Sequence, residues 1–172
     1  MLFLIMNAQD LVPKKVFLTS GKGMHESRLG AFENALRQAG IEKYNLVRVS
    51  SIMPPECKFV SKTEGLKEFK PGEIVFCVLS DSYTNNPEDS VSAAIATAYH
   101  NDSSIHGYVA EIKEKNSSLE KTEQKAVALA KNMLETISKS KTKMECKSIV
   151  EYSKPSSSGK WTCVICAAVF IL

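Results

Sequence analysis

Lys15-Val-Phe-Leu-Thr-Ser-Gly-Lys-Gly23 opens the segment that decides the fold. Its apolar and β-branched residues predict a strand, and the small residues of Ser20-Gly-Lys-Gly23 predict a turn that ends this strand. A helix is expected next, from Glu26 to Ala39, because apolar residues recur there every three or four positions, at Leu29, Phe32, Leu36 and Ala39. Gly40 is a natural stop, and the alternating segment 45–51 predicts the second strand of a β-α-β unit.

The rest of the chain continues this alternation. Strands are expected at residues 74–79, 106–112, 147–152 and 161–171, with a short one around 59–60. Helices are expected at about 88–98, where Val91, Ala94, Ile95 and Ala98 have the helical period, and at 119–138, with Ala126, Ala130, Met133 and Ile137 facing inward. This order predicts an α/β protein with repeated β-α-β units. The last two strands have no helix between them, which favours a mixed sheet.

The length of 172 residues suits one domain, and 44% apolar with 24% charged residues is typical of a soluble globular protein. We expect a single domain over residues 15–172, preceded by a poorly structured N-terminal extension over residues 1–14. A net charge of +3 without a cluster of basic residues argues against nucleic-acid binding. The apolar runs 1–6 and 161–172 are too short to span a membrane, so no membrane partner is expected.

Five cysteines with irregular spacing argue against a secreted disulfide framework and for a cytoplasmic protein with reduced thiols. Cys163 and Cys166 form a Cys-x-x-Cys motif. Positions three apart on a strand point to opposite faces, so we expect two buried apolar residues rather than a redox pair. His25, His100 and His106 lack the spacing of zinc ligands, and no metal site is expected.

Three further positions carry chemically useful groups. Glu33 lies at the edge of the apolar stripe of the first helix, and Glu111 lies within a strand on the same face as Val109. Charged residues in such positions are usually solvated. Ser50 and Ser51 end a strand just before two prolines that constrain the backbone. On the residues alone, this segment is interpreted as a strand-terminating turn.

The segment Asn45-Leu-Val-Arg-Val-Ser-Ser-Ile-Met-Pro-Pro55 resembles the self-cleavage segment of the pyruvoyl-dependent arginine decarboxylases, in which a Ser-Ser-Ile-Met-Pro-Pro string marks the processing site. The resemblance extends, in the order of the family, over most of residues 15–172. It includes Ala31-Phe-Glu-Asn-Ala-Leu36, Asp89-Ser-Val-Ser-Ala-Ala-Ile95, Gly107-Tyr-Val-Ala-Glu111 and the Cys- and Ala-rich final strand.

This resemblance implies a zymogen that undergoes autocatalytic cleavage between Ser50 and Ser51 into a β chain, residues 1–50, and an α chain, residues 51–172. The Ser51 hydroxyl attacks the Ser50 carbonyl, and β-elimination followed by hydrolysis converts Ser51 into an N-terminal pyruvoyl group. Asn45 matches a family asparagine that positions the scissile carbonyl or stabilises its developing oxyanion.

The resemblance also implies the reaction, which is the decarboxylation of L-arginine to agmatine and CO2 for polyamine synthesis or acid resistance. The covalent pyruvoyl group forms a Schiff base with the substrate amine, so that neither pyridoxal phosphate (PLP) nor a metal is needed. Glu111 matches the glutamate that protonates the carbanion left by CO2. Glu33 and Ser50 are the implied substrate-binding residues, and Glu33 stands where the family has an aspartate that pairs with the substrate guanidinium.

The family fold is a four-layer α/β/β/α sandwich, and its members assemble as trimers of αβ units with active sites between subunits. Glu33 is one methylene longer than the family aspartate, so the same chemistry on a different amino acid is an open alternative. Two alternatives come from other classes. One is a non-processed relative that binds a small molecule, and the other is thiol redox chemistry at Cys163 and Cys166.

Overall fold

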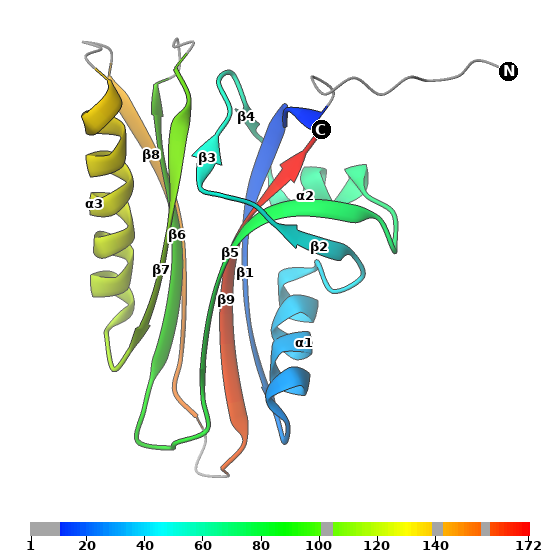
Figure 1. Cartoon of the computed structure of the whole chain (residues 1–172). Coiled ribbons are helices and arrows are strands. Elements are labelled where there is room, and N and C mark those ends of the chain that lie inside the picture. Colours follow the sequence, from blue (N-terminus) through cyan, green and yellow to red (C-terminus); the bar gives the residue numbers. More distant parts are fainter. Residues whose placement is uncertain (1–10, 101–104, 139–142, 156–158) are drawn as a thin grey trace, which may run out of the picture.

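The computed structural model describes residues 11–100, 105–138, 143–155 and 159–172. Over these residues the chain forms a mixed α/β fold in which two β-sheets face each other and helices lie on their outer sides (Figure 1). Most of the N-terminal extension predicted for residues 1–14 lies outside the described residues. Lys14 is already tied to the fold, because its N–H donates a hydrogen bond to the carbonyl of Ile171 at 2.8 Å.

The five-stranded sheet has the strand order β2-β5-β9-β1-β4, and the four-stranded sheet has the order β3-β7-β6-β8. The five-stranded sheet is mixed, as predicted, because β9 is antiparallel to β1 and β5 whereas β2 is parallel to β5 and β4 is parallel to β1. The strands are β1 (Lys15–His25), β2 (Asn45–Arg48), β3 (Ile52–Met53), β4 (Lys58–Phe59), β5 (Ile74–Thr84), β6 (Val91–His100), β7 (Gly107–Lys115), β8 (Met144–Ser153) and β9 (Trp161–Ile171). The helices are α1 (Arg28–Ala39), α2 (Lys62–Gly65), which continues into a 3-10 turn at Leu66–Glu68, and α3 (Leu119–Ile137).

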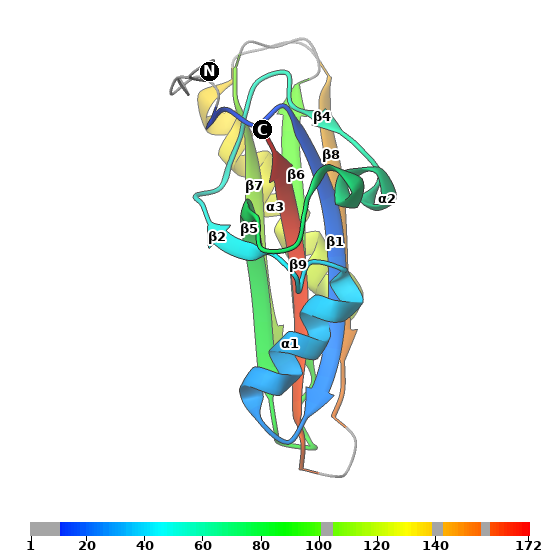
Figure 2. The same ribbon diagram turned by 90° about the vertical axis from the view of Figure 1, so that its right-hand side faces the viewer.

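Three apolar clusters join these elements. The helix α1 packs on the outer face of the five-stranded sheet, and α3 packs on the outer face of the four-stranded sheet through Ala126 and Ala130. The inter-sheet core, which fills the space between the two sheets, includes Val78, Ile95 and Val109. Turned by 90°, the molecule shows α1 in front of the sheets and α3 behind them (Figure 2). None of the helices in the described residues combines the length and apolar character that crossing a membrane requires.

The glycines of β1 have a packing role that the sequence analysis missed. The prediction of a turn at Ser20-Gly-Lys-Gly23 is wrong, because this segment continues β1. The strand stays paired with β9 as far as His25, which lies opposite Trp161. A Cβ atom at Gly23 would collide with the backbone of Ala31 and Ala35, and one at Gly21 would collide with the helix in the same way. The missing side chains therefore let α1 lie directly on the strand.

This close approach also decides which face of α1 is buried. The predicted stripe included Leu29, but that side chain is 76% exposed, and the buried residues are Ala31, Ala35, Leu36 and Ala39. Small alanines fit against the glycines of β1, where larger side chains would hold the helix away. The helix ends at Gly40 as predicted, in the left-handed conformation (φ 80°) that glycine adopts without strain.

The prediction of a helix at residues 88–98 is wrong, because most of this segment forms the strand β6. It lies between β7 and β8 and is buried on both faces, with Ile95 in the inter-sheet core and Ala94 against α3. A strand buried on both faces has no polar alternation, and its spacing of apolar residues then resembles a helical period.

The prediction of repeated β-α-β units is therefore only partly correct. β5 and β6 lie in different sheets, β6 pairs antiparallel with β7, and the last two strands, β8 and β9, also belong to different sheets. The units that remain are β1-α1-β2 and β7-α3-β8, and in each of them other strands separate the two connected strands. In α3, Ala126 and Ala130 are buried as predicted, together with Thr122 and Leu134, whereas Ile137 is exposed.

We predict that Gly23→Ala destabilises the fold, because the added methyl group must push α1 away from β1. The expected loss is about 1–3 kcal/mol in the free energy of unfolding, measured by urea denaturation. Lys22→Ala is the matched control on the same strand. The Lys22 side chain is half exposed and contributes one long contact to Glu151, so a change within about 0.5 kcal/mol is expected. Equal stabilities for the two variants would contradict the packing role of Gly23.

Candidate functional site

The chain crosses from one sheet to the other at Ser50 and Ser51, between the end of β2 and the start of β3 (Figure 1). On the β2 side, the N–H of Val49 donates to the carbonyl of Cys77 in β5 at 3.0 Å. On the β3 side, the carbonyl of Ser51 accepts from the N–H of Val109 in β7 at 2.9 Å. The Ser50–Ser51 peptide bond is therefore held between two strands that belong to different sheets.

A short turn surrounds this peptide bond. The N–H of Ile52 donates to the carbonyl of Ser50 at 2.9 Å, which closes a three-residue turn centred on Ser51. Ser50 is exposed and Ser51 is half-buried. Among the described residues, left-handed φ values outside glycine occur at Glu56 (60°) and Asn116 (55°), so the turn at Ser51 does not use a left-handed conformation.

The register of β3 on β7 brings Ser51 towards Glu111. Ile52 lies opposite Tyr108 and Met53 opposite Gly107, so Ser51 lies opposite Val109, in agreement with the hydrogen bond between them. Residues opposite each other, and residues two apart on one strand, share a face of the sheet. Glu111 is therefore on the same face as Ser51, one diagonal step of about 7–8 Å away, and its side chain is exposed.

Asn45 lies at the opposite end of β2 from this turn. Its side-chain amide donates to the carbonyl of Gly72 at 2.6 Å, and its N–H donates to the carbonyl of Glu73 at 2.8 Å. Asn45 and Ser50 are five positions apart in an extended segment, a span of about 16 Å. Within one chain, the Asn45 amide therefore does not contact the Ser50 carbonyl.

Glu33 lies on α1, on the far side of the five-stranded sheet from β3 (Figure 1). One of its carboxylate oxygens accepts from Nε of Arg37 at 3.1 Å and lies 3.0 Å from Nη2 of the same residue. The Glu33 side chain is 41% exposed. A single chain thus brings Ser50, Ser51 and Glu111 together and leaves Glu33 and Asn45 apart from them.

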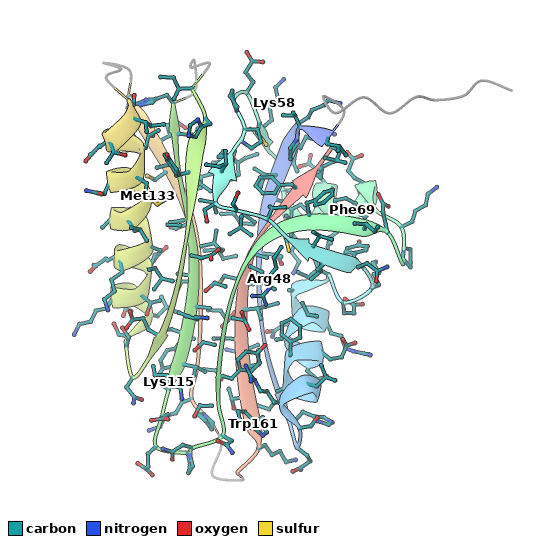
Figure 3. All side chains as sticks on the ribbon, in the orientation of Figure 1. Arg48, Lys58, Phe69, Lys115, Met133 and Trp161 are labelled. Atoms are coloured by element: carbon teal, nitrogen blue, oxygen red, sulfur yellow. The ribbon has the colours of Figure 1, made fainter. Side chains whose placement is uncertain are left out.

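An ion pair near the turn was missed in the sequence analysis. Arg48, near the middle of the molecule in Figure 3, lies three residues before Ser51 on β2. Its Nη1 atom contacts Oδ1 of Asp81 on β5 at 3.0 Å, and the Asp81 side chain is only 15% exposed. The pair fixes β2 to β5 immediately before the crossing. No local pattern in the sequence connects these two positions, because their contact depends on the parallel pairing of β2 with β5.

Hollows flank the crossing on two sides. One of about 480 Å³ is lined by Ser50 and mostly apolar neighbours such as Val49, Ile52 and Phe76. A larger one of about 730 Å³ lies beyond the Pro54-Pro55 segment and includes Lys58, which Figure 3 places at the upper end of the molecule. Both have sizes typical of small-molecule sites, and Ser50 itself lines the first.

Cys163 and Cys166 lie on opposite sides of β9 and do not form a thiol pair. Cys163 lies in the cluster beneath α1, and Cys166 lies in the inter-sheet core, so the two thiols point to opposite faces of β9 as predicted. Burial raises the pKa of the Cys163 thiol to about 12 and also raises the pKa of Cys166, which leaves both protonated and unreactive near neutral pH. This arrangement disfavours the redox alternative. In the described part of the chain, no group of three or more His, Cys, Asp or Glu side chains has the arrangement of a metal site.

Comparisons with known proteins agree with one another. A sequence profile of the pyruvoyl-dependent arginine decarboxylase family matches residues 15–172. A Methanosarcina mazei protein named pyruvoyl-dependent arginine decarboxylase 1 is 47% identical over 162 residues, which cover 94% of this chain and 98% of that protein. A Methanocella arvoryzae protein named pyruvoyl-dependent arginine decarboxylase is 47% identical over 165 residues, covering 95% and 99% of the two chains. A Nitrosopumilus maritimus protein of the same name is 36% identical, with coverage of 95% and 99%.

Proposed function

The chain belongs to the pyruvoyl-dependent arginine decarboxylase family, and from this premise we propose that it cuts its own backbone between Ser50 and Ser51 and then converts L-arginine to agmatine and CO2. Similarity over nearly the whole chain makes it an enzyme of this kind, with a covalent pyruvoyl cofactor. The observation in the structure that carries the proposal is the register of β3 on β7, which places Ser51 and Glu111 on one face of the sheet.

The residues around Ser51 suit a pyruvoyl group made from this serine. A cut before Ser51 would leave this residue at a chain end. Its carbonyl would still accept the hydrogen bond from the N–H of Val109, and Met53, two residues further on, would stay buried. The pairing of β3 with β7 would therefore hold the group in place. The pyruvoyl group supplies a carbonyl that accepts the electron pair released when CO2 leaves the substrate.

Self-cleavage needs only groups that the chain carries and water. The Ser51 Oγ forms a bond to the carbonyl carbon of Ser50, the bond from that carbon to the Ser51 nitrogen breaks, and the hydroxyl proton ends on the freed amine. Elimination then breaks the bond between Cβ of residue 51 and the ester oxygen, which releases Ser50 as a carboxylate. Hydrolysis replaces the nitrogen of residue 51 by the oxygen of water and releases ammonia. The turn that holds Ser51 beside the Ser50 carbonyl supports this step because it restricts the relative orientations of the Ser51 hydroxyl and the Ser50 carbonyl.

We assign to Glu111 the delivery of a proton to the substrate carbon that has lost CO2. Its place on the face of Ser51, one diagonal step away, lets a carboxyl group reach a substrate attached at Ser51. The mostly apolar hollow lined by Ser50 and Ile52 lies next to Ser51 along the chain, and apolar surroundings destabilise a carboxylate relative to CO2.

We further infer that Glu33 and Asn45 act on substrate or scissile bond from a neighbouring copy, in the trimer that the family implies. Both lie away from Ser51 in one chain. Apolar side chains near β2 and the crossing are 37% to 62% exposed and would be covered by such a neighbour, namely Val47, Val49, Ile52 and Ile74. The three apolar clusters, which lie under α1, between the sheets and under α3, likewise support the four-layer α/β/β/α arrangement.

The test of the proposal is the intact mass of the denatured protein. We expect two chains with ends at residues 50 and 51, the larger one carrying a carbonyl that reacts with hydrazine. Ser51→Ala lacks the attacking hydroxyl, so it should give one chain with no carbonyl. A wild-type protein that is folded, single-chained and unreactive would indicate instead a non-processed relative that binds a small molecule.

Glu111→Gln should lower kcat for arginine by about 100-fold or more in protein that is already cleaved, because an amide cannot donate the proton. The measurement is CO2 release at saturating arginine. Glu114→Gln is the matched control on the same strand, since Glu114 lies on the opposite face of β7 and pairs with Lys125 at 2.9 Å. Similar kcat values for the two variants would contradict the role of Glu111.

Glu33→Ala should raise the KM for arginine by about tenfold or more, because the substrate guanidinium loses a charged partner. The control is Glu26→Ala, which removes an exposed carboxylate that pairs with Lys160 near the same helix. An unchanged KM in Glu33→Ala would remove this residue from the substrate site. Wild-type protein assayed with arginine, ornithine and lysine tests the substrate itself, and a preference for another amine would reassign it.

A further inference from the structure

The turn at Ser51 contains a hydrogen-bond donor aimed at the atom that changes charge during self-cleavage. The N–H of Ile52 lies 2.9 Å from the carbonyl oxygen of Ser50. We propose that this backbone N–H donates a hydrogen bond to the oxyanion formed in the self-cleavage step. The inference rests on the proposed function, because it concerns how the chain cuts itself.

The pairing of β3 with β7 leaves this N–H available. In an antiparallel pair, hydrogen-bonded and non-hydrogen-bonded residue pairs alternate. Ser51 and Val109 form a hydrogen-bonded pair, as the 2.9 Å contact shows, so the next pair, Ile52 and Tyr108, is non-hydrogen-bonded. The N–H of Ile52 therefore points away from β7, to the side on which the crossing chain passes.

The hydrogen bond from this donor becomes stronger as the reaction proceeds. Attack by the Ser51 Oγ turns the carbonyl oxygen of Ser50 into an oxyanion, and hydrogen bonds to charged oxygens are about twice as strong as those to neutral ones. The donor is also held in place beforehand. Met53, the next residue, is 1% exposed, and Pro54 and Pro55 stiffen the chain after it.

The Asn45 amide of the same chain does not compete for this role. It donates to the carbonyl of Gly72, at the far end of β2. The Ile52 N–H belongs instead to the residue that follows the nucleophile, so the donor, the oxyanion and the attacking hydroxyl are fixed by one turn of three residues.

The experiment replaces the Ile52 N–H by an oxygen atom. The full chain is made by cell-free translation with the α-hydroxy analogue of isoleucine at position 52, which converts that amide into an ester, removes the donor and weakens the Ser51 carbonyl as an acceptor. The matched control carries the α-hydroxy analogue of phenylalanine at position 59. Lys58 and Val60 donate their N–H groups to the carbonyls of Lys14 and Val16, so the intervening Phe59 N–H also points away from its paired strand. Intact mass at timed intervals follows the conversion of each full-length chain into its two products.

We expect the ester at position 52 to slow self-cleavage by at least about tenfold, and by up to about 1,000-fold. The ester at position 59 should stay within about twofold of the all-amide chain. Equal rates for the two esters, whether both fast or both slow, would overturn the proposal. So would a loss of the folded circular-dichroism signal in the position-52 ester alone, because the N–H would then be required by the fold. If the all-amide chain itself stays intact, like Ser51→Ala, the proposed function fails together with the inference.

Discussion

The Ser50–Ser51 peptide bond is held by hydrogen bonds from two different sheets, and the geometry of the site depends on how those sheets are placed. Val49 is tied to β5 and Ser51 to β7. The two sheets are in turn fixed to each other close by, because Ser80 Oγ of β5 donates to the carbonyl of Ile112 in β7 at 2.6 Å. A displacement of one sheet relative to the other would therefore act directly on the conformation of this peptide bond.

Polar contacts close the space between the sheets along both sides, whereas its centre is apolar. On the side of the crossing, Ser82 repeats the contact of Ser80 by donating to the carbonyl of Glu114 at 3.3 Å. On the opposite side, Ser20 and Lys22 of β1 contact the carboxylate of Glu151 in β8. Carbonyl groups at the edge of a sheet need partners, and the serines of β5 provide them without another strand. The apolar centre then supplies cohesion, and the polar edges fix the relative placement of the sheets.

The sequence predicts those parts of the fold that depend on local patterns. The C-terminal end of α1, both ends of α3, most of the extended segments and the opposite orientation of Cys163 and Cys166 follow from periodicity and from residues such as Gly40. It does not predict features that arise from contacts between distant segments. The β1 glycines are indistinguishable from a turn until α1 is placed on them, and β6 resembles a helix until both of its faces are known to be covered. The candidate site shows the same division. The resemblance singles out Ser51 and Glu111 as candidates, whereas the Arg48–Asp81 pair and the hydrogen bond from Ile52 to Ser50 depend on strand register.

The proposed cut at the crossing would change how the chain folds. The fragment 1–50 would contain β1, α1 and β2, and β1 lies between β9 and β4, paired with β9 from Lys15 opposite Ile171 to His25 opposite Trp161. Neither fragment has a complete five-stranded sheet, so the two would remain associated through the shared core after the covalent link is lost. Folding before the cut is a first-order process. Refolding of the separated fragments is second-order and depends on their concentration. Self-cleavage would thus turn a chain that refolds by itself into a complex whose assembly depends on how often its two halves meet.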